Sequence, residues 1–225
     1  MNNTLTAKRH TLAHLLAASV LKHYPHAKLT LGPAIDTGFY YDIDFSGGDV
    51  PNDGDLKELQ TGMKKLLNSW TEFSHRTVTP DEARAYFAGN EFKTELISEL
   101  EAKGGTITLY TCGKEPHTFT DLCRGGHSAN PSKDIDPDSF ALDKIAGAYW
   151  RGDETKPMLT RIYGLAFDTK EELDAYRAQV EEAKKRDHKK LGPELDIFTF
   201  SPLVGPGLPL WTPKGTMLRN LLDEY

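Results

Sequence analysis

The sequence has only two cysteines, Cys112 and Cys123, among its 225 residues. Two thiols cannot build the disulfide framework that stabilises many small secreted domains, so each cysteine needs its own explanation. No apolar run approaches the ~18 residues that a membrane-spanning helix requires. A charged start followed by an apolar stretch, the mark of a secretory signal, is also missing. We therefore expect a cytoplasmic chain with no membrane contact.

An excess of positive charge is missing as well. Lys and Arg number 27 against 33 Asp and Glu, which gives a formal net charge of -6. Nucleic-acid-binding modules usually have a basic surface, so the composition argues weakly against a pure RNA-binding module. A local patch can still bind within an acidic whole. Between Arg177 and Lys190, six basic residues outnumber three acidic ones.

The chain lacks the motifs of several large enzyme classes. It has no Walker-type phosphate loop and no dinucleotide-binding fingerprint, and the G-x-S-x-G nucleophile elbow is absent. What remains is the composition of an ordinary globular protein, with 38% hydrophobic and 27% charged residues. That composition and length predict a large domain with a real core, alone or with an appendage.

Helices are predicted where apolar residues recur every three to four positions. Leu12, Leu16 and Val20 form such a stripe, and Pro25 marks its end. Residues 79–82, Thr-Pro-Asp-Glu, combine a capping threonine, a proline at the first helical position and the glutamate of a capping box. The expected helices cover residues 6–24, residues 55–70, a segment that begins at 79, and residues 91–103.

Strands are predicted where apolar and polar residues alternate. In residues 39–45, aromatic and aliphatic side chains alternate with Tyr40, Asp42 and Asp44, which is the period of a half-buried strand. A turn at residues 32–33, Gly-Pro, suggests a hairpin with the strand before it. Further strands are expected at residues 29–31, 106–111, 140–150 and 159–167. The pattern predicts an α+β fold, an antiparallel sheet with packed helices.

The character of the sequence changes after Ala166. Asp168 and Thr169 can cap a new helix, which we expect to be long and exposed and to end at Gly192-Pro193. The last residues form a Gly/Pro-rich stretch followed by a helical run that continues to the final residue. The expected organisation is therefore a domain over 1–166, a linker helix over 167–192 and a further segment over 193–225.

Two pairs of residues could carry chemistry. His10 and His14 lie four positions apart on the first helix, so both rings project from one face. Cys123 and His127 repeat this spacing in DLCRGGH, although Gly125 and its neighbouring glycine favour a loop there. Imidazole and thiolate ligands suit zinc. The same residues suit proton transfer to and from water at neutral pH.

Each candidate also has an ordinary structural explanation. A histidine pair on a helix is often a chance feature of the surface, and Lys93 on a helix face is normally solvated. Tyr41 would by default belong to the core, and Asp121 could simply cap or turn its loop. Cys112 has no histidine at ligand spacing and is typical of a buried strand cysteine. The remaining histidines are interpreted as structural or surface residues: His23, His26, His75, His117 and His188.

The two motifs HTLAH and DLCRGGH together resemble the HxxxH and CxxxH pair of the editing domains of threonyl- and alanyl-tRNA synthetases and their free-standing relatives. Other segments are similar, in order and spacing, to the bacterial threonyl-tRNA synthetases, and this resemblance covers nearly the whole chain. They are LGPAIDTGFYYDID, AGAYWRGDETKPMLTRIYG, RDHKKLGPELDIF and GPGLPLWTPKGTMLRNLLDEY.

The resemblance implies a domain organisation. Residues 1–166 would be an editing domain of the second additional domain type found in threonyl- and alanyl-tRNA synthetases. Residues 167–192 would be its linker helix, and 193–225 the truncated start of a class II catalytic domain, with part of motif 1, a dimer-interface element. ATP, magnesium and a catalytic-site zinc are expected only in the part of the catalytic domain that this sequence lacks. The small amino-terminal domain usual in the family is also missing, and the full-length protein is expected to be a homodimer.

The resemblance also implies an activity, the hydrolysis of serine from wrongly charged threonine tRNA, whose acceptor end would be the partner. In this hypothesis, His10 and Lys93 position and activate water at the ester carbonyl. Asp121 holds the seryl amine or the terminal ribose. The remaining residues shape the pocket: His14, Cys123, His127 and Tyr41. Gly126 stands where the family commonly has proline, which we expect to loosen the loop.

Two alternatives stay open, a non-catalytic module that docks the tRNA acceptor end and a free-standing editing factor. A zinc ion is an open question too. The spacing of His10, His14, Cys123 and His127 favours zinc, and the alanyl branch of the family uses these four positions as ligands. The threonyl branch is thought to work without the metal. We therefore expect no cofactor to be required for editing.

Overall fold

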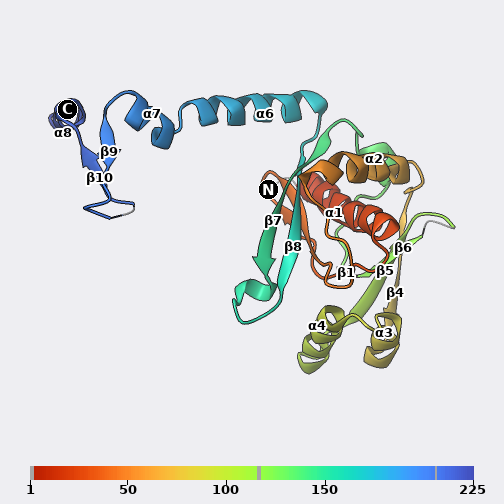
Figure 1. Cartoon of the computed structure of the whole chain (residues 1–225). Helices are drawn as coiled ribbons and strands as arrows, with labels where there is room; N and C mark the ends of the chain where they lie inside the picture. The colour runs from red at the N-terminus through yellow and green to blue at the C-terminus, as the bar shows by residue number, and fades with distance from the viewer. Residues whose placement is uncertain (1–2, 116–117, 206) are drawn as a thin grey trace. The chain divides into compact units, whose positions relative to one another are not determined.

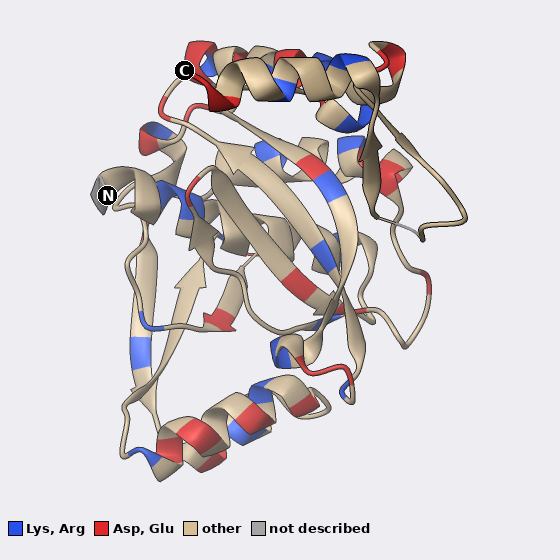
Figure 2. Ribbon diagram, turned by 90° about the vertical axis from the view of Figure 1, so that its left-hand side faces the viewer, with Lys and Arg blue, Asp and Glu red and all other residues tan. Residues whose placement is uncertain are grey.

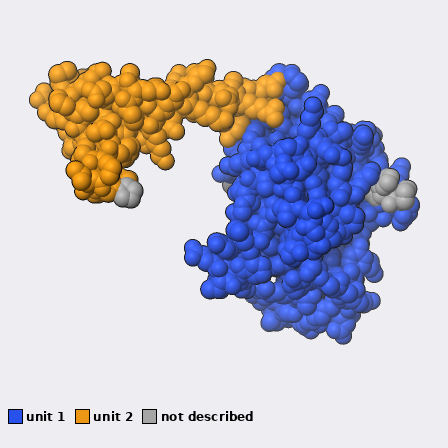
Figure 3. All heavy atoms as spheres, in the orientation of Figure 1, with its two compact units in different colours: residues 1–173 blue, residues 174–225 orange. Residues whose placement is uncertain are grey.

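The computed structural model describes residues 3–115, 118–205 and 207–225. His117, which the sequence assigns to a structural or surface role, lies outside these residues. The chain divides into two compact units, residues 1–173 and residues 174–225 (Figure 3). We describe each unit by itself.

The first unit is built around an antiparallel sheet of five strands in the order β1-β3-β8-β7, with β2 pairing with β3. These strands are β1 (Lys28–Leu29), β2 (Ala34–Ile35), β3 (Gly38–Asp44), β7 (Phe140–Tyr149) and β8 (Met158–Ala166) (Figure 1). The hairpin expected from the sequence exists, because Leu29 pairs with Ile43 across β1 and β3. The tight turn, however, lies between β2 and β3, where Ile35 faces Gly38.

Two helices, α1 (Asn3–His23) and α2 (Leu56–Leu67), cover one face of this sheet. The predicted stripe on α1 is buried, with Leu16 and Val20 completely inaccessible. These side chains join the odd-numbered positions of β3 in the main hydrophobic core, with Trp70 following α2. Burial of such aliphatic and aromatic side chains contributes roughly 1.5–3 kcal/mol each. The α1 helix, which carries the first histidine pair, is therefore held firmly on the sheet.

The other face of β3 is also largely closed to solvent. Asp42 and Asp44 are only 6% exposed, so the half-buried strand predicted from alternation is buried on both sides. Asp42 can be buried because it forms a two-pronged ion pair with Arg161 of β8. The Arg161 Nε lies 2.6 Å from Oδ1, and a terminal nitrogen of Arg161 lies 2.8 Å from Oδ2. Paired carboxylates can be buried where isolated ones cannot.

A second, three-stranded sheet in this unit has the antiparallel order β4-β5-β6. It consists of β4 (Phe73–Val78), β5 (Ile107–Cys112) and β6 (Phe119–Leu122), and it is accompanied by α3 (Pro80–Tyr86) and α4 (Glu91–Ala102). The capping box predicted at Thr79 is present, since Thr79 accepts from the Glu82 N–H while Glu82 accepts from the Thr79 N–H. Three short helical turns complete the unit: η1 (Asp53–Asp55), α5 (Pro131–Asp134) and η2 (Trp150–Gly152).

The helix over the unit boundary begins as predicted, with the Glu172 N–H donating to Thr169 Oγ1. The single helix expected over 167–192 is interrupted, however, into α6 (Lys170–Lys185) and α7 (His188–Glu194). Asp187 causes the break, because its side chain caps the Lys189 N–H and so starts a new helix. Gly192 and Pro193 fall inside α7 instead of ending the helix.

The remainder of the second unit is a hairpin of β9 (Phe198–Phe200) and β10 (Pro209–Trp211), followed by α8 (Pro213–Asp223). Acidic and basic residues are interspersed along the helices (Figure 2), and on α6 Lys184 pairs with Glu181. None of the helices in the described parts of the chain combines the length and apolarity needed to cross a membrane. The arrangement confirms the predicted α+β class with antiparallel sheets and packed helices.

Candidate functional site

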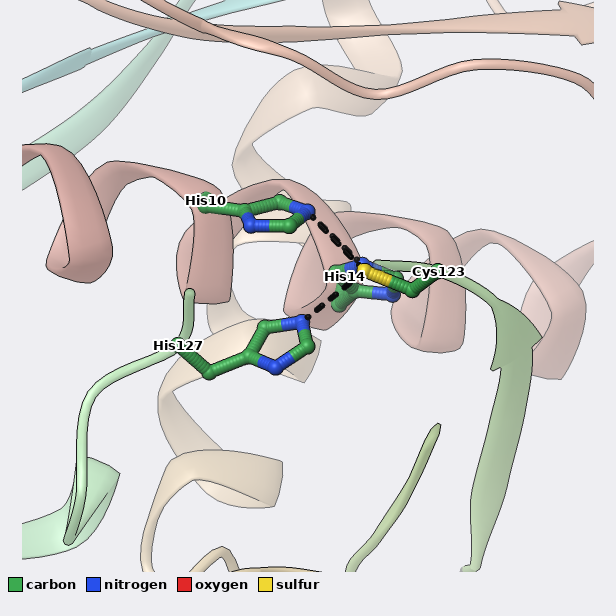
Figure 4. A group of neighbouring side chains, drawn as sticks. All are labelled: His10, His14, Cys123 and His127. Carbon is green, nitrogen blue, oxygen red and sulfur yellow. Dashed lines mark hydrogen bonds between the residues drawn. The ribbon is translucent and has the colours of Figure 1, made fainter. Parts of the chain in front are cut away.

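The two predicted pairs meet in the first unit. His14 Nε2 lies 3.2 Å from His10 Nε2, and Cys123 Sγ lies 3.5 Å from the Nε2 atoms of both His10 and His127. One ligand atom from each of the four residues lies within 4.8 Å of the others. Figure 4 shows the four side chains converging from α1 and from the segment after β6. The fold therefore brings together two sequence motifs that lie more than a hundred positions apart in the chain.

The loop that carries Cys123 and His127 depends on glycine. Gly125 and Gly126 have φ values of 88° and 85°, in the left-handed region that glycine favours. At Gly125 a Cβ would also lie 2.5 Å from Tyr110 Oη. Proline fixes φ near −65°, so this backbone excludes a proline at 126.

Lys93, Asp121 and Tyr41 form a second, buried group beside the histidines. Lys93 Nζ lies 2.5 Å from Asp121 Oδ1, and each side chain is only 2% exposed. The Tyr41 hydroxyl donates to Asp121 Oδ2 at 2.5 Å, and His14 Nδ1 lies 3.7 Å from the same oxygen. The ordinary explanation for Lys93, a solvated helix face, is therefore wrong. Asp121 belongs to β6, opposite Tyr110, and not to a capping turn.

Burial keeps the histidine rings neutral. Desolvation lowers the pKa of His127 to about 2, and the neighbouring His14 and His10 lower it further. Desolvation also lowers the pKa of His14. It lowers the pKa of His10 as well, although hydrogen bonding of the His10 ring to the Gly126 backbone partly opposes this shift. A general base must be neutral and must also keep an affinity for a proton. His10, whose pKa is lowered less than those of His14 and His127, is therefore the best candidate of the three rings.

The thiol and the phenol in the site are protonated for the same reason. Burial raises the pKa of Cys123 to about 11, so its sulfur is a thiol and a poor nucleophile at neutral pH. Burial, followed by the charge of Asp121, raises the pKa of Tyr41 well above its usual value. Tyr41 therefore acts as a hydrogen-bond donor to Asp121.

A cavity of about 380 Å³ opens onto both groups. Its walls come from α1, the residues after β1, β3, α4 and β6, and its size is that of a small-ligand pocket. Several lining residues were not singled out from the sequence, because only the tertiary fold places them here: Thr30, Leu31, Pro33, Tyr40, Leu96 and Arg124. Phe73, which stacks on His127 at 3.9 Å between ring centroids, was also missed. Its strand, β4, has an exposed, polar sequence that gave no signal.

The four converging residues fit zinc by their chemistry. A tetrahedral zinc site with bonds of 2.0–2.3 Å places its ligand atoms roughly 3.3–3.8 Å apart, and the closest pairs here are 3.2 and 3.5 Å apart. His14 also has a carboxylate behind it, as ligating histidines usually do. His127 differs, because its buried Nδ1 has no hydrogen-bond partner among the described residues.

The chain matches no protein-family model. It is 47% identical over 219 residues to a threonine–tRNA ligase of Citrifermentans bemidjiense, covering 96% of this chain and 33% of that protein. Against a threonine–tRNA ligase of Dehalococcoides mccartyi, identity is 45% over 221 residues, 98% of this chain and 36% of that protein. The chain thus spans about a third of the length of these relatives. The resemblance to the bacterial threonyl-tRNA synthetases is confirmed over nearly the whole chain.

Proposed function

We propose that the cavity hydrolyses the ester that joins serine to the acceptor end of threonine tRNA. The observation that carries the proposal is the closed Lys93–Asp121–Tyr41 group beside the neutral ring of His10. Burying a lysine and an aspartate is costly, and perturbed, desolvated groups in a cavity mark functional sites. The similarity to threonine–tRNA ligases supplies the class of substrate.

In this mechanism His10 is the general base that takes a proton from the attacking water. Lys93 supplies positive charge where the ester oxygen becomes negative. An ammonium has three donor hydrogens, and Asp121 is the one carboxylate that lies within ion-pair distance of Lys93 among the described residues, so donors remain for water and substrate. His14, Cys123 and His127 shape the wall around His10.

Asp121 has two tasks in this proposal. Its oxygens already accept from Lys93, from the Tyr41 hydroxyl and from the Leu122 N–H. A carboxylate offers about four acceptor positions, so one remains for the amine of the serine or the terminal ribose. The first task of Asp121 is therefore to fix Lys93 and Tyr41, and the second is to orient the substrate.

Serine selection has a physical reason. Serine lacks one methyl of threonine, and a binding pocket gains only about 1–3 kcal/mol from such a group. A second, smaller pocket that excludes threonine corrects this weak discrimination. Gly32 and the inaccessible ring of Tyr41 form one tightly packed wall of the cavity, since a Cβ at Gly32 would lie 2.3 Å from the Tyr41 ring.

Zinc, if bound, would be held by His10, His14, Cys123 and His127 and would polarise the ester or lower the pKa of a water molecule. We propose that hydrolysis does not require it, because His10 can act as the base in its neutral form. Chelator resistance of the reaction tests this point.

We assign the activity to residues 1–166, with 167–192 as the linker to the beginning of a class II catalytic domain at 193–225. The second unit supports this assignment, because it exposes large apolar side chains of the kind that a larger domain would cover. They are Leu203, Leu208, Trp211, Met217, Leu221 and Leu222.

The test is the release of serine from seryl-tRNA by the 225-residue chain, with and without a chelator, beside a tRNA-binding assay. Serine release above the spontaneous rate supports the editing reaction. Binding without any release would instead favour a module that only docks the acceptor end.

A further inference from the structure

Helix α4 carries Lys93 and bridges the two sheets of the first unit. On one side Ile97 packs with Val78, Ile107 and other residues in the core beneath the three-stranded sheet. On the other side Phe92 packs against Trp150 and Leu159, at the far end of β7 and β8. The position of Lys93 therefore depends on how α4 is attached to both sheets.

Glu95 forms the polar half of the attachment to the β7–β8 connection. One carboxylate oxygen accepts from the Trp150 indole N–H at 3.0 Å. The other lies 3.1 Å from Arg151 Nε and 3.2 Å from Lys156 Nζ. Trp150 is only 2% exposed, and a buried indole N–H that loses its acceptor costs roughly 1–3 kcal/mol. This carboxylate thus has one acceptor role that water cannot easily replace.

The connection itself is held in an unusual backbone conformation. Arg151 has φ 59°, a left-handed geometry that costs a non-glycine residue roughly 1–3 kcal/mol and persists only where the surroundings enforce it. Its side chain reaches α4 twice, at Glu95 and at Glu99, where the Arg151–Glu99 distance is 2.5 Å. Strain and ion pairs together indicate a connection shaped to meet α4.

Phe92, Glu95 and Glu99 occupy successive turns of α4 on the side of the β7–β8 connection, and Lys93 projects beside them into the cavity. The Lys93 N–H is also capped by Asn90 Oδ1 at 3.1 Å. A tilt of α4 would therefore move the Lys93 ammonium relative to Asp121. We propose that Glu95 is a positioning residue for Lys93, which acts by fastening α4 to the 150–156 connection. The inference rests on the proposed hydrolysis of seryl-tRNA.

The test compares three variants of the 225-residue chain in steady-state deacylation. Glu95→Leu removes the acceptor and the charge, Glu95→Gln keeps an acceptor for Trp150, and Glu101→Leu is the matched control. Glu101 lies on the same helix but pairs with Arg84 of α3. Since small displacements of a catalytic group can cost about 100-fold, we expect Glu95→Leu to lower kcat about 10- to 100-fold with KM nearly unchanged. Glu95→Gln should recover most of kcat.

Hydrogen exchange of the amides at 91–96 is measured in parallel, because it does not depend on activity. Faster exchange in Glu95→Leu, but not in Glu101→Leu, is expected. Equal kcat values for Glu95→Leu and Glu101→Leu, a rise in KM alone, failure of Glu95→Gln to recover kcat, or unchanged exchange would each overturn the positioning role. An inactive wild-type chain would instead overturn the proposed function. In that case the hydrogen-exchange measurement would still test whether Glu95 fastens α4.

Discussion

On each face of β3, a tyrosine lies beside an aspartate that is paired with a cationic side chain. On one face, Tyr41 donates to Asp121, whose cationic partner Lys93 is 2% exposed. On the other, Tyr40 lies under Arg161, with the guanidinium carbon 3.9 Å from the ring centroid, and Arg161 pairs with Asp42.

The difference between these two groups is in access and in neighbours. The side chain of Arg161 is 24% exposed, and its guanidinium makes a two-pronged ion pair with Asp42, which is a stable structural arrangement. Lys93 is sealed from bulk water but open to a cavity, and neutral histidines stand beside its partner. A buried ion pair is weak evidence for stability. The Lys93–Asp121 pair indicates a catalytic site because it lies beside both a cavity and the neutral histidines.

The largest effect is expected at the base itself. His10→Ala should reduce serine release by about 100- to 10,000-fold, the usual contribution of a general base, without unfolding the domain. His75→Ala is the control, since His75 lies on β4 outside the cavity lining. Deacylation rates and circular dichroism are measured for both. Full residual activity of His10→Ala would remove this residue from the mechanism.

The second prediction separates the two cations. Lys93→Met should lower serine release by about 100-fold and also destabilise the fold by about 3–5 kcal/mol, because Asp121 is left buried without its partner. Arg161→Met should cost stability but change the deacylation rate by less than about threefold. Urea unfolding and single-turnover kinetics measure the two quantities. Equal rate losses in both variants would erase the distinction between the two faces.

The tyrosines give a finer version of the same comparison. Tyr41→Phe removes one hydrogen bond to Asp121, at an expected cost of about 1–3 kcal/mol, and should slow serine release about tenfold by loosening Asp121. Tyr163→Phe is the control, because Tyr163 lies beside Tyr40 on β8 but outside the cavity lining, and it should leave the rate of serine release nearly unchanged. If Tyr163→Phe slows the reaction as much as Tyr41→Phe, the functional group is not confined to one face of β3.

The smallest effect is a pH dependence of stability. The pKa of His127 is near 2 in the folded chain and about 6.5 when unfolded. The unfolded state therefore binds the extra proton first, so the stabilisation is complete above pH 6.5 and is lost as the pH falls from 6.5 towards 2. Below 6.5 the loss approaches about 1.4 kcal/mol per pH unit. Urea unfolding at pH 7.0 and 5.5 should show a smaller loss for His127→Asn than for wild type, and identical losses would contradict the assignment.

Local sequence signals predicted much of the fold. The stripe on α1 and the capping box at Thr79 depend on residues three or four positions apart, and both were found. The break at Asp187 was missed, because the expectation relied on Gly192-Pro193 and overlooked a capping aspartate within the run. Strands β4 and β6 were not foreseen, since their alternation is short or polar.

The site could be predicted in part for a related reason. His10 and His14 share a helix, so their spacing fixes their common face, and the Cys123 motif supplied its counterpart. The burial of Lys93 could not be predicted from the sequence, because charged residues surround it along α4. Lys93 is buried because α4 packs between the two sheets. The same applies to Phe73, whose stacking on His127 joins residues more than fifty positions apart.

The most direct measurement is a competition in which the 225-residue chain acts on seryl- and threonyl-tRNA in one reaction, and the two amino acids released are counted. The account predicts that serine is released at least about 100-fold faster than threonine, as expected when one methyl is excluded sterically and not merely bound less well. Equal release of both amino acids, or no release above the spontaneous rate, would contradict it.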